Sequence, residues 1–156
     1  RNHAQRGQFV KSKKTQRILP TTGTVLAKNF ALYAGGTPVI VTCQTNVSLT
    51  ISTNMYSAAC KDSGAWDAQL PGLKSWTANL EGNFAFDATY GYSRLFAAQV
   101  SGTTVAIVMQ SGVTGDKKYS GTAYVSNLQL DSSGNDAPVT FSCTLTGTGA
   151  VTEATI

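Results

Sequence analysis

LKSWTANLEGNFAF, residues 73–86, is the stretch that decides the fold class. Apolar and polar residues alternate in its middle, so that Trp76, Ala78 and Leu80 share one face. An alternation with a period of two is typical of a β-strand that buries one face and exposes the other. The stretch therefore predicts a half-buried strand.

The same kind of pattern recurs along the rest of the chain. FALYAGGTPVIVT (residues 30–42) has two apolar runs around Gly35-Gly36, which is typical of a β-hairpin. The further strand-like runs are NVSLTIST (46–53) with Val47, Leu49 and Ile51 on the buried side, TTVAIVMQ (103–110), KYSGTAYVSNLQL (118–130), and PVTFSCTLT (138–146) with Val139, Phe141, Cys143 and Leu145 on the buried side.

One segment, residues 87–102, breaks the period of two. Tyr92, Leu95, Phe96 and Val100 follow one another at helical spacing, and Gly102 is well placed to end a helix. About seven strands and one short helix predict a mainly β fold, an antiparallel β-sandwich or partly closed barrel with one short flanking α-helix. We expect a single domain over residues 21–156, preceded by a basic N-terminal arm at residues 1–20.

Charge is sparse and unevenly placed. Charged residues make up 13% of the chain, about half the usual share in globular proteins. The first seventeen residues hold six bases and no acid, whereas from residue 29 onward eight acids outnumber five bases. The basic character therefore belongs to the N-terminal arm and not to the body, and so little charge indicates a surface largely covered by neighbours.

The cysteine pattern and the hydropathy exclude several classes of protein. Cys43, Cys60 and Cys143 show no Cys-x-x-Cys spacing, which argues against a disulfide framework or a zinc site and favours a reducing compartment. No apolar run reaches the length of a membrane span, and residues 1–20 lack the hydrophobic stretch of a signal peptide. We expect no metal, no cofactor and no membrane contact.

Cys60-Lys61-Asp62-Ser63 is the one cluster that suggests chemistry. A cysteine nucleophile needs a base, and the only histidine is His3 in the N-terminal arm. Asp62 and Asp67 could act as an acid and a base, although carboxylates in loops are more often caps or solvated groups. We expect no catalytic site.

The residues that follow this cluster are apolar. Trp66, Leu70, Pro71 and Leu73 come from a segment that we predict to be a loop, with a turn at Pro71-Gly72. Either this loop folds over its own domain, or it packs on a neighbouring subunit, as exposed apolar clusters at interfaces do. The residues alone leave both interpretations open, and these four are our candidate subunit-interface residues.

Over about residues 24–150, the sequence resembles the major tail tube proteins of long-tailed bacteriophages, the siphophage type. The blocks that carry the resemblance are Lys61-Asp62-Ser63-Gly64 with Trp66, Pro71-Gly72-Leu73-Lys74-Ser75-Trp76, Gly115-Asp116-Lys117 with Tyr119-Ser120-Gly121, and Thr146-Gly147-Thr148-Gly149. Their number and order make the resemblance more specific than any single motif would.

The resemblance implies a structural virion protein without enzymatic activity. Hexameric rings of such a protein stack into a tail tube, first around a tape-measure protein and later around DNA that passes without specific binding. Tail terminator and tail-tip proteins are the further implied partners, and the tail is assembled in the host cytoplasm. A loop between two strands reaches an adjacent subunit or ring. The candidates for a smooth lumen wall are the hydroxyl runs Ser48, Thr50 and Ser52 or Thr140, Ser142 and Thr144.

The N-terminal arm departs from the family, whose usual start is much shorter. Its candidate contact residues are Arg6, Lys11, Lys13, Lys14 and Arg17. We expect the arm to run along the outer wall or between rings and to pair with acids of the next subunit within Asp116–Asp136.

Two alternatives stay open at this point. An icosahedral coat protein could use a basic arm ahead of a β-sandwich to bind nucleic acid. A secreted β-sandwich adhesin or carbohydrate-binding module is the other, but the absence of a signal-like stretch argues against it.

Overall fold

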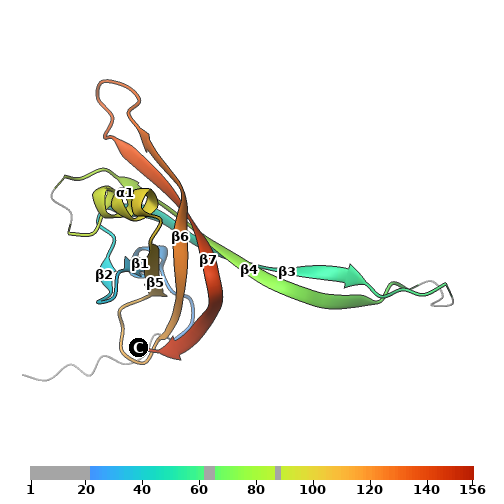
Figure 1. The fold of residues 1–156 in the computed structure, drawn as a ribbon. Helices are drawn as coiled ribbons and strands as arrows, with labels where there is room; N and C mark the ends of the chain where they lie inside the picture. Colours follow the sequence, from blue (N-terminus) through green and yellow to red (C-terminus); the bar gives the residue numbers. More distant parts are fainter. Residues whose placement is uncertain (1–21, 62–65, 87–88) are drawn as a thin grey trace, which may run out of the picture.

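The computed structural model describes residues 22–61, 66–86 and 89–156 (Figure 1). Their elements are a short 3-10 helix η1 (Ala27–Asn29), one α-helix α1 (Tyr92–Ser101) and the strands β1 (Ala31–Ala34), β2 (Val39–Ile40), β3 (Gln44–Ser57), β4 (Gln69–Asn83), β5 (Thr104–Gln110), β6 (Lys117–Asp131) and β7 (Thr140–Thr155).

The seven strands form one antiparallel sheet in the order β2-β1-β5-β6-β7-β4-β3. The prediction of a mainly β, antiparallel fold with one short flanking helix is therefore confirmed. All strands belong to a single curved sheet that does not close, with α1 lying against one of its faces (Figure 1).

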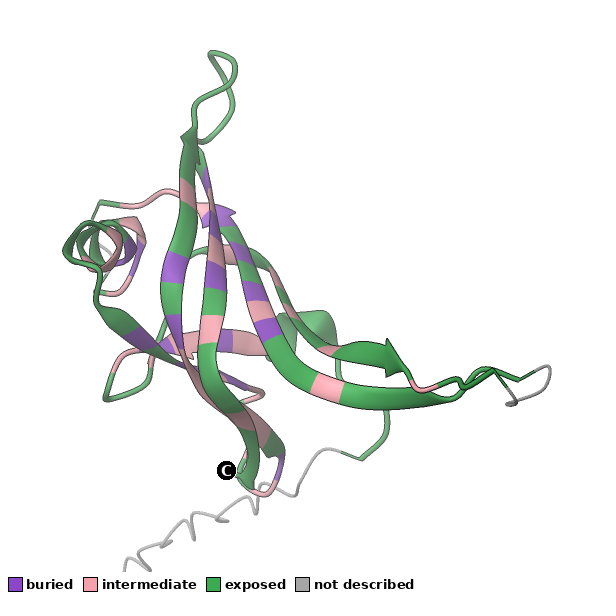
Figure 2. Cartoon of the chain, turned by 45° about the vertical axis from the view of Figure 1, so that its right-hand side comes forward, coloured by how far each residue is buried: buried purple, intermediate pink, exposed green. Residues whose placement is uncertain are grey.

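The core lies on the face that the alternating residues predicted. Trp76, Ala78 and Leu80 of β4 are buried, as are Phe141, Cys143 and Leu145 of β7, and the buried residues cluster near the middle of the strands (Figure 2). The Trp76 indole lies across two neighbouring strands at glycines: a Cβ on Gly147 would overlap it, and a Cβ on Gly121 would come within 2.7 Å of its Cζ2 atom. Its Nε1 donates a hydrogen bond to the carbonyl of Gly149 at 2.9 Å.

A side-chain amide bridges the seam at which the sheet fails to close. The backbone N–H of Leu32 on β1 donates to Oε1 of Gln44 on β3 at 2.9 Å, and Nε2 of Gln44 donates to the Leu32 carbonyl at 3.1 Å. Nε2 also donates to the Val41 carbonyl at 3.1 Å. The Gln44 amide thus takes the place that a peptide group of a neighbouring strand would occupy.

Helix α1 ends where the sequence predicted. Gly102 adopts a left-handed conformation with φ 64°, and its N–H bonds to the carbonyls of Ala98 and Gln99. Glycine takes this conformation without the penalty that a Cβ imposes. Leu95 is the residue of α1 that is buried against the core.

The outer halves of β3 and β4 leave the body of the molecule as a two-stranded projection (Figure 1). We call residues 51–61 and 66–76 the β3–β4 projection. Strand β7 pairs with β4 only over Thr77–Asn83, so beyond Trp76 the two strands pair only with each other. Ile51, which we expected on a buried face, is exposed because the core ends at this point.

The predicted turn at Pro71-Gly72 is wrong, because both residues lie inside β4. Pro71 is opposite Met55, next to a register shift in the β3–β4 ladder, and β4 has no second neighbour there. Proline has no backbone N–H to donate to a ladder, so within sheets it is confined to edge positions of this kind and to bulges. The Tyr56 ring lies over Gly72, where any Cβ would overlap it.

None of the helices in the described part of the chain has the length and apolar character that crossing a membrane requires.

Candidate subunit interface

The four candidate interface residues, all on the β3–β4 projection, are not part of the core. Trp66 is 89% exposed and Leu73 is 79% exposed, and Leu70 is also exposed. Pro71 is exposed beside them in β4. All four candidate interface residues therefore lie together on the projection, three of them in a strand and not in the loop that we predicted. Figure 2 shows the projection as exposed along almost its whole length.

Both faces of the projection are apolar. Tyr56 pairs with Leu70, and their neighbours Met55 and Pro71 pair with each other. Because successive side chains of a strand point to opposite faces, these two pairs lie on opposite sides of the ribbon. Sequence reasoning missed Met55 and Tyr56, although two adjacent large apolar residues in an otherwise polar run were a visible signal. A ribbon with two apolar faces suits insertion between surfaces.

The base of the connecting segment is fixed by hydrogen bonds around Asp67. Ser57 Oγ donates to Asp67 Oδ1 at 2.8 Å, and the Gln69 side-chain amide donates to Asp67 Oδ2. These bonds tie the end of β3 to the start of β4. Asp67 is therefore a structural brace in this fold, and Asp62, its proposed acid–base partner, lies outside the described residues.

Cys60 lies in the β3–β4 projection, close to the gap in the described residues. Its thiol is exposed and contacts the carbonyl oxygen of Ala58 at 3.8 Å. His3 lies outside the described residues, as does Ser63. Over residues 22–61, 66–86 and 89–156, no group of three or more His, Cys, Asp or Glu side chains could hold a metal ion.

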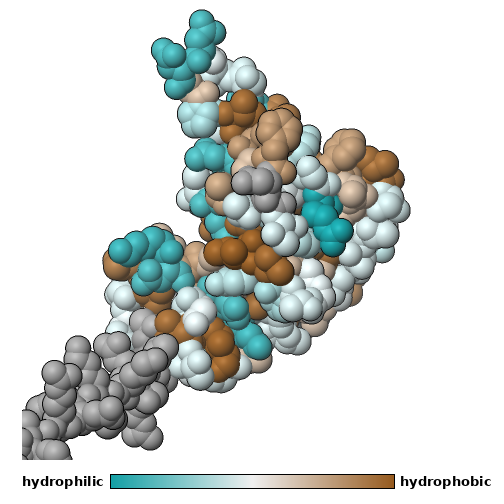
Figure 3. Space-filling view, turned by 90° about the vertical axis from the view of Figure 1, so that its left-hand side faces the viewer, coloured by the Kyte–Doolittle hydropathy of each residue, from teal (hydrophilic) through white to brown (hydrophobic). Residues whose placement is uncertain are grey.

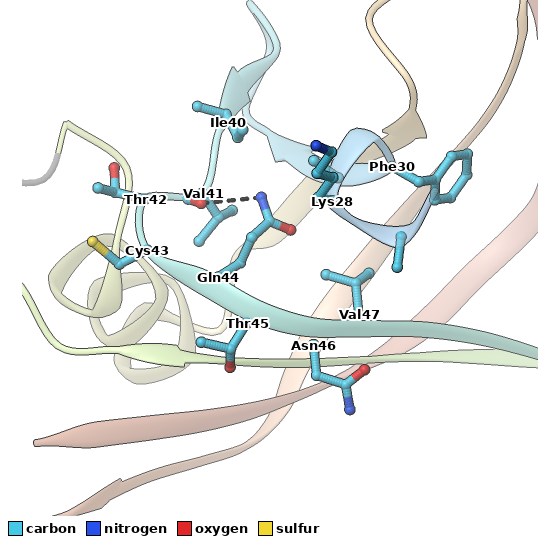
Figure 4. Close-up of a pocket in the computed structure, with 12 residues that line it drawn as sticks. Lys28, Phe30, Ile40, Val41, Thr42, Cys43, Gln44, Thr45, Asn46 and Val47 are labelled. Atoms are coloured by element: carbon cyan, nitrogen blue, oxygen red, sulfur yellow. Dashed lines mark hydrogen bonds between the residues drawn. The ribbon is translucent and has the colours of Figure 1, made fainter. Parts of the chain in front are cut away.

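A groove of about 710 Å³ lies along the open seam of the sheet, between η1–β1–β2 and the start of β3. Figure 4 shows Gln44 reaching from β3 toward Val41, with Lys28 and Ile40 on the far side. Among the described residues, its lining combines aliphatic side chains and Phe30 with amides, hydroxyls, Cys43 and one lysine, and it includes no carboxylate. The groove offers surface for packing.

The two hydroxyl runs considered for a lumen wall lie on the same face of the single sheet. Ser48 is opposite Asn79, which is opposite Thr144. On the next row, Thr50 is opposite Thr77, which is opposite Thr146. We call this the polar face. Its three central rows are Asn46–Glu81–Ser142–Gln129, Ser48–Asn79–Thr144–Asn127 and Thr50–Thr77–Thr146–Tyr124. Glu81 is the only charged residue in these rows.

Several hydroxyls of the polar face are bonded to one another. Thr144 Oγ1 donates to Asn79 Oδ1 at 3.0 Å, and Thr146 Oγ1 donates to Ser126 Oγ at 2.9 Å. Ser126 Oγ in turn donates to the Thr144 carbonyl at 3.0 Å. These hydroxyl groups donate their hydrogen bonds within the sheet, so fewer hydroxyl donors remain to bind a passing phosphate.

The candidate contact residues of the N-terminal arm, Arg6, Lys11, Lys13, Lys14 and Arg17, lie outside the described residues. Of the acids expected to receive them, Asp116 is buried, and its Oδ2 accepts a hydrogen bond from Ser111 Oγ. Asp131 and Asp136 are exposed at the tip of the β6–β7 hairpin. The acidic surface in this range is therefore confined to that tip.

Comparison with known proteins identifies the family. A family model described as "Phage tail tube protein" matches residues 26–153. A comparison with curated protein sequences gives no match.

Solved structures show the same fold at low identity. The tail of an empty gene transfer agent particle with C6 symmetry has a TM-score of 0.73 and 12% identity, and covers 84% of this chain and 99% of that chain. The match to the SPP1 tail tube has a TM-score of 0.69 and 12% identity, and covers 85% of this chain and 80% of that chain. The match to the sheath–tube complex of an extracellular contractile injection system (PVC) has a TM-score of 0.60 and 15% identity, and covers 85% of this chain and 93% of that chain. The chain thus has the fold of these tube subunits and belongs to the phage tail tube protein family, whose role is structural and whose place is the virion.

Proposed function

We propose that copies of this chain form hexameric rings that stack into the tail tube, which encloses a tape-measure protein and later conducts DNA. The observation that carries the proposal is the β3–β4 projection, which exposes apolar side chains on both faces. The solved tail with C6 symmetry, which shares the fold, supports the sixfold arrangement. No catalytic step is part of the proposed function.

The energetics of the projection favour burial against another copy. An isolated two-stranded hairpin is at best marginally stable in water, because it has no third strand or core to pack on. The exposed fractions of Trp66 and Leu73 exceed three quarters. Covering a large apolar side chain contributes about 1.5–3 kcal/mol. Packing between neighbouring subunits would stabilise the projection and join the subunits at the same time.

The polar face is the surface that we assign to the lumen. Its central rows carry neutral side chains and the single acid Glu81. A wall rich in lysine would release counterions from DNA and hold it, whereas a neutral or slightly acidic wall does not. This face would therefore let the tape-measure protein and DNA move past without specific binding.

The remaining partners concern the ends and the outside of the tube. We propose that tail terminator and tail-tip proteins close the two ends and that the tail is assembled in the host cytoplasm. The fold is shared with the tube-terminating cap of the anti-feeding prophage, at a TM-score of 0.55 and 13% identity. We place the N-terminal arm on the outer wall or between rings, with Asp131 and Asp136 of the next subunit as its acidic contacts.

The direct experiment is to concentrate the purified chain and examine it by negative-stain microscopy and sedimentation. Stacked rings or tubes are the expected result. Closed shells that retain nucleic acid would favour the coat-protein alternative, and monomers at all concentrations would contradict the proposal. Leu73→Ser should suppress the tubes, and Ser48→Thr on the polar face is the matched control that should leave them intact.

A further inference from the structure

We propose that the surface that receives the β3–β4 projection is an aromatic patch on a second copy of this chain. This inference rests on the proposed function and names the partner surface of the projection. We define the aromatic patch as Phe84, Phe86, Tyr92, Phe96 and Val100.

The rings of the patch hold one another in place. The Phe84 and Phe86 centroids are 4.7 Å apart at an interplanar angle of 83°, and Phe84 meets Tyr92 edge to face at 5.5 Å. Tyr92 stacks on Phe96 at 6.3 Å and contacts the buried Phe141 at 6.1 Å. The chain of rings therefore runs from the core to the surface, and the geometry of each pair is one that aromatic rings prefer.

The outer side chains of the aromatic patch are open to solvent in the single subunit. Phe86 is 92% exposed and Val100 is 72% exposed. Tyr92, Phe96 and Val100 follow at intervals of four residues and so form one stripe along α1, while Leu95 faces the core. Figure 3 looks onto the side of the molecule on which α1 lies and shows several hydrophobic side chains at its surface. An ordered apolar stripe of this kind is typical of an interface.

The positions of the two surfaces determine what kind of assembly their contact produces. In Figure 1 the β3–β4 projection extends from one side of the body, and α1 lies on the opposite side. A contact between two different surfaces of identical chains is heterologous, so it propagates into a ring or a stack. Pairing of projection with projection would instead be two-fold and would end at a dimer. A tube therefore requires a receptor elsewhere on the chain.

The seam groove is the competing receptor, and its apolar surface is less exposed. Ile40 of the groove lining is 46% exposed, whereas Phe86 and Val100 of the patch are 92% and 72% exposed. Covering the patch therefore removes more apolar surface per side chain from water. We therefore infer that the aromatic patch receives the projection.

Matched substitutions distinguish the two receptors. Phe86→Ser and Val100→Ser each remove an exposed apolar side chain of the patch, and Ile40→Ser does the same in the groove. If the inference is correct, the two patch variants raise the critical concentration for tube formation about fivefold or more, since a central interface residue contributes over 1 kcal/mol and each 1.4 kcal/mol is a factor of ten. Ile40→Ser should leave that concentration unchanged, and melting of the unassembled protein should show that all three variants fold.

Cross-linking then identifies the contact itself. In a Cys43→Ser, Cys60→Ser background, protein with Ser75→Cys on the projection is mixed with protein carrying Ser93→Cys beside the patch, and a short bismaleimide is added during assembly. A heterodimer should form in tubes and not below the critical concentration, and Ser48→Cys on the polar face should give none with Ser75→Cys. Wild-type tubes with unaffected patch variants and no Ser75–Ser93 cross-link would overturn this inference alone. Failure of the wild type to form tubes would contradict the proposed function itself.

Discussion

The indole of Trp76 fills the space that a side chain on Gly147 would need. Trp76 comes from β4 and Gly147 from the adjacent β7, and the indole also crosses Gly121 of β6. Three strands are thus joined by one aromatic side chain that lies where the β3–β4 projection begins. This arrangement explains why glycines occur inside strands, where they normally weaken the structure.

Gly147→Ala should therefore destabilise the fold. The added methyl group forces the indole or the backbone to shift, and overpacking of this kind costs about 1–3 kcal/mol. Urea unfolding below the assembly concentration, followed by circular dichroism, measures the loss. Gly36→Ala is the control, since no atom lies within 4 Å of a Cβ built there. Equal midpoints for the two variants would show that the Trp76–Gly147 contact is not tight.

Gln44→Leu should loosen the seam of the sheet. The substitution removes three hydrogen bonds that join the Gln44 amide to Leu32 and Val41. Each unsatisfied backbone group costs about 1–3 kcal/mol where water cannot replace the lost partner. We expect a lower unfolding midpoint and faster amide exchange at Leu32. The exposed Gln129→Leu should change neither quantity, and protection at Leu32 that survives the Gln44 substitution would refute the bridge.

The three thiols should react at different rates. Burial raises the pKa of the Cys143 thiol to about 12, whereas Cys43 and Cys60 are exposed. Because the thiolate is the reactive form, Cys143 should be alkylated last, at a rate limited by opening of the fold. Mass spectrometry of peptides after timed iodoacetamide treatment measures the order. Cys60→Ser should still form tubes, and loss of any catalysed turnover on that substitution would contradict the structural role.

The same pKa shift predicts a loss of stability in alkali. The folded pKa of Cys143 lies above the ordinary value of 9.0, so the unfolded chain loses its proton first. Its contribution to stability is complete below pH 9 and declines as the pH rises toward 12. Cys143→Ala should reduce this decline, which denaturant titrations across that pH range would detect. Identical pH profiles for the two proteins would exclude Cys143 as the cause.

Removal of residues 1–17 should weaken tubes without unfolding the subunit. If the basic arm pairs with acids of the next subunit, moderate salt should reproduce part of the loss, because salt screens exposed pairs. If all six bases bound phosphates instead, log affinity for duplex DNA would fall with log salt at a slope of about −5. Tube length and DNA retention, scored for intact and truncated protein, separate the two roles. Normal tubes with lost DNA binding would exclude the ring-to-ring placement.

Sequence reasoning predicted the parts of the fold that depend on local pattern. The alternation of Trp76, Ala78 and Leu80 identified a strand and its buried face, and Gly102 identified the end of α1. In both cases the periodicity of the chain and the identity of one residue were sufficient. The grouping of Trp66, Leu70, Pro71 and Leu73 on one feature was also visible in the sequence.

What the sequence did not predict depends on where neighbouring strands end. Pro71-Gly72 has the composition of a turn, yet β4 continues through it, because the pairing of β4 with β7 ends at Thr77 and leaves an edge that tolerates proline. Ile51 has the alternation of a buried residue, but it lies just past the core for the same reason. The Gln44 bridge joins residues twelve positions apart through a side chain, and no periodic pattern signals such a contact.

The fluorescence of Trp66 tests the central claim most directly, because Trp66 is 89% exposed in the single subunit. Comparing the wild type with Trp66→Phe isolates its emission from that of the buried Trp76. If the β3–β4 projection inserts against another copy, assembly should shift Trp66 emission to shorter wavelength and reduce its quenching by iodide. Tubes in which iodide quenches Trp66 as strongly as in the monomer would contradict the account.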